Sequence, residues 1–322
     1  MTNIISLAIP LFALIFLGLL AGKIVPEDRR GLVWINIFVV YLAIPSLIFK
    51  LISKAPLEEL VNWRYVAGTT LSTYLIFMLM LITAVLIGRA SLRVASMQAS
   101  AAAYGNVGYM GVPLAVAVFG DMAAAPATLI LSFDTALFFM LVPLLQAADR
   151  PSASLGDALR EGAKSIAFNP LILALVAGAL AAATSLRLPA PVDATIGYLA
   201  AGAAPAALFA IGVTIARQPP GSVNWEIPVI SLCKLVVHPM LVLGVMMVMG
   251  GFEPMWVEVA VLLAALPTAA NVYVLATKFD VYTEGASSSI LITTLAAVGT
   301  LSVLLLLISL GVTRSNPFAW LG

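Results

Sequence analysis

Two apolar stretches of the chain carry asparagine together with proline and glycine. Residues 104–113 read Tyr-Gly-Asn-Val-Gly-Tyr-Met-Gly-Val-Pro, and residues 266–273 read Leu-Pro-Thr-Ala-Ala-Asn-Val-Tyr. Proline lacks an N–H and clashes with the preceding turn, and glycine is a weak helix former, so a continuous helix is unfavourable at both places. The amides of Asn106 and Asn271 add donors and acceptors that need partners.

Each stretch has two interpretations. In one, the helix is broken inside the membrane, and its freed backbone groups line a cavity and bind a ligand. In the other, glycines allow a kinked helix to pack closely against its neighbours. Because two such breaks occur, we favour ligand binding.

Three ionisable side chains lie within apolar sequence, where charge is costly and usually functional. Removal from water favours the neutral form of Asp134, which makes it a candidate proton carrier; the alternative is a hydrogen-bonded packing residue. Lys234 and His238 are four residues apart and share a helix face. Lys234 could attract an anionic substrate or pair with Asp134. His238 could take part in coupling to an ion, or it could be a packing residue that forms hydrogen bonds.

Hydroxyl side chains are concentrated at residues 287–294, where Ser288 is a candidate ligand for a coupling ion. Serine and threonine also serve as ordinary hydrogen-bond partners between membrane helices. The chain has one cysteine and one histidine, which excludes an intramolecular disulfide and a cluster of either residue around a metal. We predict no catalytic residues, no metal site and no cofactor. Asp134 and the hydroxyl side chains make H⁺ or Na⁺ the candidate coupling ion.

Composition indicates the elements that position these side chains. Of 322 residues, 62% are hydrophobic and 10% are charged, which excludes a soluble globular fold. The net charge of +1 gives no indication of a nucleic-acid partner. Apolar runs long enough to cross a bilayer predict ten helices, at about 3–22, 32–51, 65–88, 94–119, 124–147, 163–184, 193–215, 227–249, 255–278 and 284–311.

Charge placement predicts the orientation of these helices. Of the 16 lysines and arginines, ten follow odd-numbered spans, five lie on the opposite side and Lys234 is within a span. Basic residues favour the cytoplasmic side. We therefore expect a multi-pass protein of the cell membrane with both termini outside.

The polar connection at 148–162 separates five predicted spans at 1–147 from five at 163–314. Because five is odd, two similar halves would have opposite orientations, as in many secondary transporters. Pro45 and Pro205 occupy corresponding places and each precedes a phenylalanine by four residues. Spans 4 and 9, the broken ones, also correspond. These matches predict a 5+5 inverted repeat.

The motif Gly105-Asn106-x-x-Tyr109-Met-Gly-Val-Pro113 resembles that of the auxin efflux carrier family, which includes the plant PIN auxin exporters and bacterial carriers named for malonate and other organic acids. Residues 264–267 and 272–276 resemble the second crossing element of that family. The resemblance covers essentially the whole chain.

This resemblance implies a crossover fold like that of sodium/proton antiporters. Spans 1, 2, 6 and 7 would form a scaffold that holds a homodimer together, and spans 3–5 and 8–10 would form a transport domain that carries a small organic anion by an elevator mechanism. The substrate would bind beside the crossing of spans 4 and 9. The predicted substrate-binding residues are Gly105, Asn106, Tyr109, Pro113, Lys234, Pro267 and Asn271, and the predicted coupling residues are Asp134, His238 and Ser288.

Three alternatives stay open. A sodium-coupled symporter of the bile-acid type would have the same ten-span crossover plan. A channel would not need alternating access. A membrane-embedded enzyme would need a nucleophile or metal site, and neither HExxH nor GxSxG occurs; GxxxxGK[ST], the motif of ATP-driven proteins, is also absent.

Overall fold

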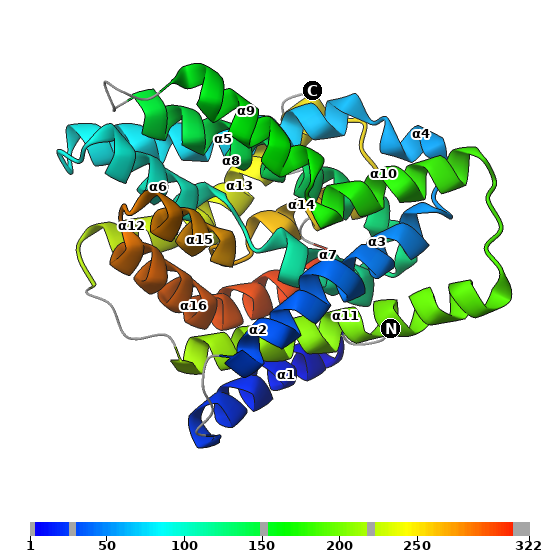
Figure 1. The fold of residues 1–322 in the computed structure, drawn as a ribbon. Coiled ribbons are helices and arrows are strands. Elements are labelled where there is room, and N and C mark those ends of the chain that lie inside the picture. The colour runs from blue at the N-terminus through cyan, green and yellow to red at the C-terminus, as the bar shows by residue number, and fades with distance from the viewer. Residues whose placement is uncertain (1–3, 26–29, 149–153, 218–222, 312–322) are drawn as a thin grey trace. The chain divides into compact units, whose positions relative to one another are not determined.

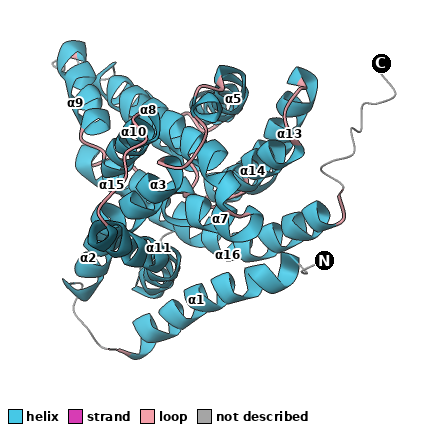
Figure 2. Cartoon of the chain, turned by 90° about the vertical axis from the view of Figure 1, so that its right-hand side faces the viewer, coloured by secondary structure: helices cyan, strands magenta, loops and turns pink. Residues whose placement is uncertain are grey.

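The computed structural model describes residues 4–25, 30–148, 154–217 and 223–311. Every regular element in these ranges is a helix (Figure 2), and a lone β-bridge joins Gly105 to Thr268. The all-α prediction is thus confirmed for the described ranges. The termini themselves, whose side of the membrane the charge pattern predicts, lie outside them.

The chain divides into two compact units. Unit 1 comprises Met1–Trp63, Val107–Ser132 and Phe168–Gln218; unit 2 comprises Arg64–Asn106, Phe133–Ala167 and Pro219–Gly322. Each unit takes segments from both halves of the chain. The bounds of these units differ from those of the predicted repeats, 1–147 and 163–314.

Unit 1 contains α1 (Ile4–Ile24), α2 (Arg30–Ile37), η1 (Phe38–Ala43), α3 (Ile44–Ile52), α4 (Leu57–Leu60), η2 (Val107–Gly111), α7 (Val112–Phe119), η3 (Asp121–Ala123), the start of α8 (Ala124–Ala148), α10 (Pro170–Ala183) and α11 (Ala190–Arg217). Helices α1 and α11 run side by side (Figure 1). A Cβ on Gly18 would lie 2.1 Å from the carbonyl oxygen of Phe209, and one on Gly212 would lie 2.0 Å from that of Ile15. Only glycine permits backbones to approach this closely.

Unit 2 contains α5 (Trp63–Leu86), α6 (Leu92–Ala103), the rest of α8, α9 (Leu155–Ala167), α12 (Glu226–Leu232), η4 (Cys233–Val237), α13 (His238–Met249), α14 (Pro254–Ala264), α15 (Ala270–Phe279) and α16 (Thr283–Ser309). Its core lies among α5, α6, α12 and α15, where Met80, Met97, Ile230 and Val272 are buried. This core holds the interrupted segments in place.

Three π-helical segments have a common cause in the sequence. Each of η1, η2 and η4 ends just before a helix whose second residue is proline, at Pro45, Pro113 and Pro239. The proline ring clashes with the carbonyl four residues earlier, and a wider π turn relieves that clash. Lys234 lies in one of these turns, a kind of irregularity that is frequent at functional sites.

Within the described residues, six helical segments are long and apolar enough to cross a membrane, or seven if Leu155–Ala167 and Pro170–Ala183 count as one span. The six are Gly31–Ile52, Leu57–Leu86, Asp121–Ala148, Ala190–Arg217, Glu226–Met249 and Thr283–Ser309. Shorter apolar helices at Ala13–Ile24, Val107–Phe119 and Pro254–Ala264 coincide with predicted spans 1, 4 and 9. A polytopic membrane protein is supported, while the count of ten spans and the inverted repeat remain predictions.

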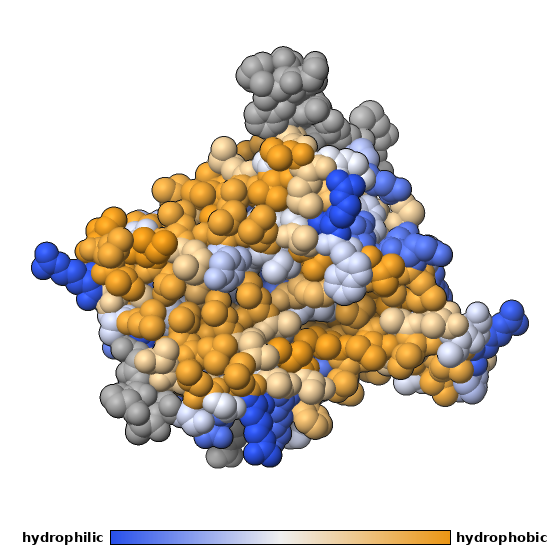
Figure 3. Space-filling model, turned by 90° about the horizontal axis from the view of Figure 1, so that it is seen from above, coloured by the Kyte–Doolittle hydropathy of each residue, from blue (hydrophilic) through white to orange (hydrophobic). Residues whose placement is uncertain are grey.

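The surface also fits a lipid environment. Large apolar side chains such as Trp34, Tyr198 and Val248 are more than two-thirds exposed. The face in Figure 3 is mostly apolar, with hydrophilic side chains mainly towards its margins. Exposed apolar area of this extent marks a surface that is covered by something other than water.

Candidate functional site

The two predicted breaks contact each other within unit 2. Helix α6 ends at Ala103, and the chain continues in extended conformation at Tyr104. Helix α14 ends at Ala264, and α15 begins only after the extended residue Ala269. The Asn106 N–H donates to the carbonyl of Pro267 at 2.9 Å, and the Ala269 N–H donates to the carbonyl of Tyr104 at 3.0 Å. Backbone groups freed by one break are therefore satisfied by the other.

Thr268, which the sequence analysis did not single out, fastens this pairing. Its side chain is fully buried, and its hydroxyl donates to the carbonyl of Ala101 in the last turn of α6 at 2.7 Å. Its N–H donates to the hydroxyl of Thr293 on α16 at 3.1 Å. Its position directly after Pro267 could have indicated this role from the sequence, because polar residues in a helix break can replace lost backbone hydrogen bonds.

The two asparagines lie on either side of the pairing. Asn106 is 8% exposed, and its amide makes no hydrogen bond with any other described residue. Asn271 is half-buried in the first turn of α15, where its amide bonds with the hydroxyl of Tyr104. That hydroxyl is also 3.0 Å from the hydroxyl of Thr135, beside Asp134 on α8. Tyr104 thus connects the paired breaks to Thr135, the residue that follows Asp134.

Lys234 lies with its amine next to the paired breaks, near Gly105 and the end of α14. It is fully buried, and its amine donates to the carbonyl of Ala264 at the end of α14 and lies 3.2 Å from Nδ1 of His238. A Cβ on Gly105 would come within 3.2 Å of that amine, so the glycine leaves room for it. A cation at a helix C-terminus is electrostatically favourable. The structure thus places the Lys234 amine at the C-terminal end of α14.

A chain of hydrogen-bonding groups runs from Lys234 to Asp134. Nε2 of His238 lies 3.4 Å from the hydroxyl of Thr73 on α5, and Thr73 bonds with the Asp134 carboxyl group. If the lysine donates to Nδ1, the ring's Nε2–H donates to Thr73, which donates onward to Asp134. All four side chains are at least nine-tenths buried. One carboxyl oxygen of Asp134, Oδ1, has no partner among the described residues.

The remaining predicted residues are placed as follows. Pro267 is in the break itself, and Ser288 is buried on α16, the helix that supplies Thr293. Half-buried Tyr109 and buried Pro113 belong to unit 1, in η2 and α7. Within the described ranges, no three His, Cys, Asp or Glu side chains gather as a metal-binding group.

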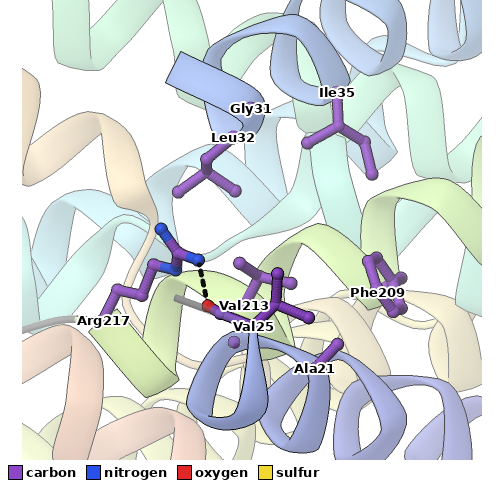
Figure 4. Close-up of a pocket in the computed structure, with 9 residues that line it drawn as sticks. Ala21, Val25, Gly31, Leu32, Ile35, Phe209, Val213 and Arg217 are labelled. Atoms are coloured by element: carbon purple, nitrogen blue, oxygen red, sulfur yellow. Dashed lines mark hydrogen bonds between the residues drawn. The ribbon is translucent and has the colours of Figure 1, made fainter. Parts of the chain in front are cut away.

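Unit 1 has a cavity of its own (Figure 4). About 200 Å³ in size, it lies between the end of α1, the start of α2 and α11. Apolar side chains such as Leu32, Ile35 and Phe209 line it, and Arg217 at one end donates to the carbonyl of Val25 at 3.0 Å. None of the predicted site residues borders this cavity.

Comparisons with known proteins cover the whole chain. A family model described as "Membrane transport protein" matches residues 3–305. The chain is 42% identical, over 99% of its own length and 100% of the relative's, to a protein of Rhizobium meliloti (strain 1021) named "Putative malonate transporter".

Proposed function

Since the chain belongs to the auxin efflux carrier family of membrane transport proteins, we propose that it is a secondary transporter that moves a small carboxylate by an elevator-type mechanism. The observation that carries this proposal is the pair of breaks, which turns two membrane segments into a polar site. The name of the Rhizobium relative favours malonate as the first substrate to examine.

The paired breaks offer an anion several donors. The first N–H groups of α15, at Ala270 and Asn271, have no carbonyl one turn before them to bond, and the positive end of the helix dipole lies there. The unpaired amide of Asn106 and the half-buried amide of Asn271 add side-chain donors. A carboxylate bound by helix N-termini and asparagine amides is the arrangement that broken helices provide in other transporters.

We assign Lys234 a supporting role in this site. Its amine is already bonded to the Ala264 carbonyl and lies against His238. It therefore acts on the substrate through its charge and by holding the end of α14. Gly105 and Pro267 shape the same backbone. Tyr109 and Pro113, which the sequence predicts as substrate-binding residues, belong to unit 1.

Coupling to a proton is assigned to Asp134. Its Oδ1 has no hydrogen-bond donor among the described residues, and a proton on the carboxyl group would remove the charge that lacks this partner. Thr73 and His238 connect the Asp134 carboxyl group to Lys234. Protonation of Asp134 would therefore alter the hydrogen bonds that reach Lys234 at the end of α14.

A sodium-coupled symporter is the second candidate. The hydroxyl of Ser287 is buried without a hydrogen-bond partner among the described residues, next to Ser288, and hydroxyl oxygens are ligands for hard cations. Sodium-dependent uptake would favour this candidate over proton coupling. Current that does not saturate with substrate would indicate a channel, and chemical turnover of the carboxylate would indicate an enzyme.

For motion, we propose that unit 2, which holds the paired breaks, is the moving body, and that unit 1 is the scaffold through which two copies associate. The tight glycine contact of α1 with α11 supports a rigid role for unit 1. Cysteines introduced into unit 2 would test this motion. The membrane face at which they can be cross-linked to unit 1 should change between transport states.

The binding site is tested by Asn106→Ala. Malonate should raise the melting temperature of the purified wild-type protein, since a ligand bound to the native state stabilises it. Asn106→Ala should reduce malonate affinity about tenfold, the loss expected for a hydrogen bond to a charged group. Thermal-shift titration measures both effects.

The matched control is Asn169→Ala. Asn169 caps α10 by accepting from the N–H of Leu171 at 2.9 Å. Loss of the cap should lower the melting temperature, at a cost of about 1 kcal/mol, and leave malonate affinity unchanged. Unchanged affinity in Asn106→Ala would remove that residue from the site.

The coupling assignment is tested by Asp134→Asn in proteoliposomes. The asparagine fills the same space but cannot release a proton, so counterflow of labelled malonate should persist while an imposed pH gradient no longer drives accumulation. Thr195→Val, on the exposed side of α11, should leave both activities at the wild-type level. A gradient response retained by Asp134→Asn would eliminate the carrier role.

A further inference from the structure

A polar cavity in unit 2 is lined by none of the residues of the paired breaks. It has a volume of about 420 Å³, and its walls come from the start of α6, the residues before α12 and the connection from α15 to α16. The residues that line it are Val94, Gln98, Asn224, Glu226, Asp280, Tyr282, Thr283, Glu284 and Gly285. Three connections that the charge pattern predicts on the cytoplasmic side therefore meet at this cavity.

The cavity is acidic from its buried end to its exposed end. Glu226 is 5% exposed, whereas Asp280 and Glu284 are exposed. No lysine or arginine is found among the described residues that line it, and none of these three carboxylates forms an ion pair within the described ranges. The neighbouring Arg93 is bonded to the side chain of Gln146 and to the carbonyl of Phe279.

Helix ends alone do not account for this charge. Glu226 and Glu284 lie in the first turns of α12 and α16, where a carboxylate is favourable. Neither side chain caps its helix, however, and the bond found for the Glu226 carboxylate is a long one of 3.4 Å from the hydroxyl of Tyr282. Burial raises the pKa of that hydroxyl, and the adjacent Glu226 adds to the effect, so the phenol stays protonated as a donor.

Gln98 supplies the independent indication of a ligand. It is 5% exposed and lines the cavity beside Glu226. Its carbonyl oxygen Oε1 is buried and has no donor among the described residues. A buried amide oxygen without a donor is costly. Gln98 and the buried Glu226 both line this cavity, so a cation there would be attracted by an amide oxygen and a carboxylate.

From Gln98 and Glu226, with the negative charge of Asp280 and Glu284 at the exposed end, we infer that this cavity binds a small cation. Two buried oxygen ligands and a volume far above that of one ion suit a metal ion that keeps several waters, or an organic ammonium ion. Bound there, the cation bridges α6, α12 and the connection before α16. Since α6 and α16 both reach the paired breaks, occupancy stabilises the cytoplasmic ends of the helices that carry them. The inference does not depend on the transported substrate.

The test uses Tb³⁺ as a probe on the full-length protein in detergent, because Tyr282 and the nearby Trp225 transfer excitation to a lanthanide bound in the cavity. Saturable luminescence is expected. Glu226→Gln and Gln98→Leu should each weaken Tb³⁺ binding about tenfold, the loss of one ligand to a charged partner. Glu284→Gln, at an exposed position, should also weaken binding.

The matched control is Glu161→Gln, which removes one carboxylate from an exposed pair with Lys278 elsewhere in unit 2 and should leave Tb³⁺ binding unchanged. Competition at constant ionic strength identifies the cation. Displacement by Na⁺, Mg²⁺ or Ca²⁺ assigns the cavity to a metal ion, and displacement by 1,3-diaminopropane assigns it to an organic ammonium ion. Absence of displacement by either, or wild-type Tb³⁺ binding in both Glu226→Gln and Glu284→Gln, overturns the inference.

Discussion

Backbones approach each other closely in both units, by different means. In unit 1, α1 and α11 stay intact, and Gly18 and Gly212 remove the side chains that would separate them. In unit 2, the helices are interrupted, and extended residues from each hydrogen-bond to the other. At the first contact both helices are continuous; at the second the chain leaves helix ends.

This difference separates packing from binding. In a continuous helix most backbone groups bond to one another, so the close contact of α1 with α11 at Gly18 and Gly212 is one of packing. Interrupted helices expose N–H groups at α15 and carbonyls at α14, and the protein uses Thr268 and Lys234 to satisfy some of them. Groups that stay unsatisfied, such as the amide of Asn106, are those that we propose bind the substrate. Substitutions that affect each contact separately distinguish the two kinds of contact.

The largest effect is expected from Gly212→Ala. Its Cβ would lie 2.0 Å from the carbonyl oxygen of Ile15, and backbone atoms cannot move aside as a flexible side chain does. Overpacking usually destabilises by about 1–3 kcal/mol, and this substitution should reach or exceed that range. Melting temperature and the yield of monodisperse protein measure the loss.

The control for Gly212→Ala is Gly244→Ala in α13, where a Cβ meets nothing within 4 Å. Alanine is the better helix former, so this variant should be unchanged or more stable by up to about 1 kcal/mol. Equal melting temperatures for both variants would show that α1 and α11 are not packed as described.

A moderate effect is expected from Thr268→Val, which keeps the shape and removes the hydroxyl. The carbonyl of Ala101 then loses its donor, and a buried group left unsatisfied costs about 1–3 kcal/mol. Thr195→Val, at an exposed position of α11, removes a similar bond, to the carbonyl of Pro191, and should change stability little. Denaturation midpoints in detergent compare the two, and equal losses would mean that Thr268 does not fasten the breaks.

The sequence was sufficient to predict where helices break but not what the breaks contact. Proline and glycine act locally, so the interruptions near Asn106 and Pro267 follow from residue type. The four-residue spacing of Lys234 and His238 likewise predicted that their side chains are neighbours. The lysine Nζ lies 3.2 Å from the histidine Nδ1. The amine's bond to Ala264 joins residues 30 positions apart in the chain, and no periodicity encodes such a contact.

Two further features were beyond a composition argument. Ten apolar runs were predicted as spans, whereas interruption at residues such as Pro267 leaves some helices too short to cross a membrane singly. Thr73 and Thr268 were missed because threonines are frequent in membrane helices and most bond only to their own helix. Their roles depend on which helices lie opposite.

The smallest effect on stability is expected from Gly105→Ala, the counterpart of Gly212→Ala in the paired breaks. Its Cβ would lie 3.2 Å from the amine of Lys234 and 3.3 Å from the carbonyl oxygen of Leu263. The end of a lysine side chain can move by a few tenths of an ångström, so the stability loss should stay below about 1 kcal/mol, the low end of overpacking. Malonate affinity should fall more, because the displaced amine changes the charge beneath the site. If Gly105→Ala instead lowers the melting temperature as much as Gly212→Ala and leaves affinity intact, the paired breaks are a packing contact like that of α1 with α11, and the substrate site has to be sought elsewhere.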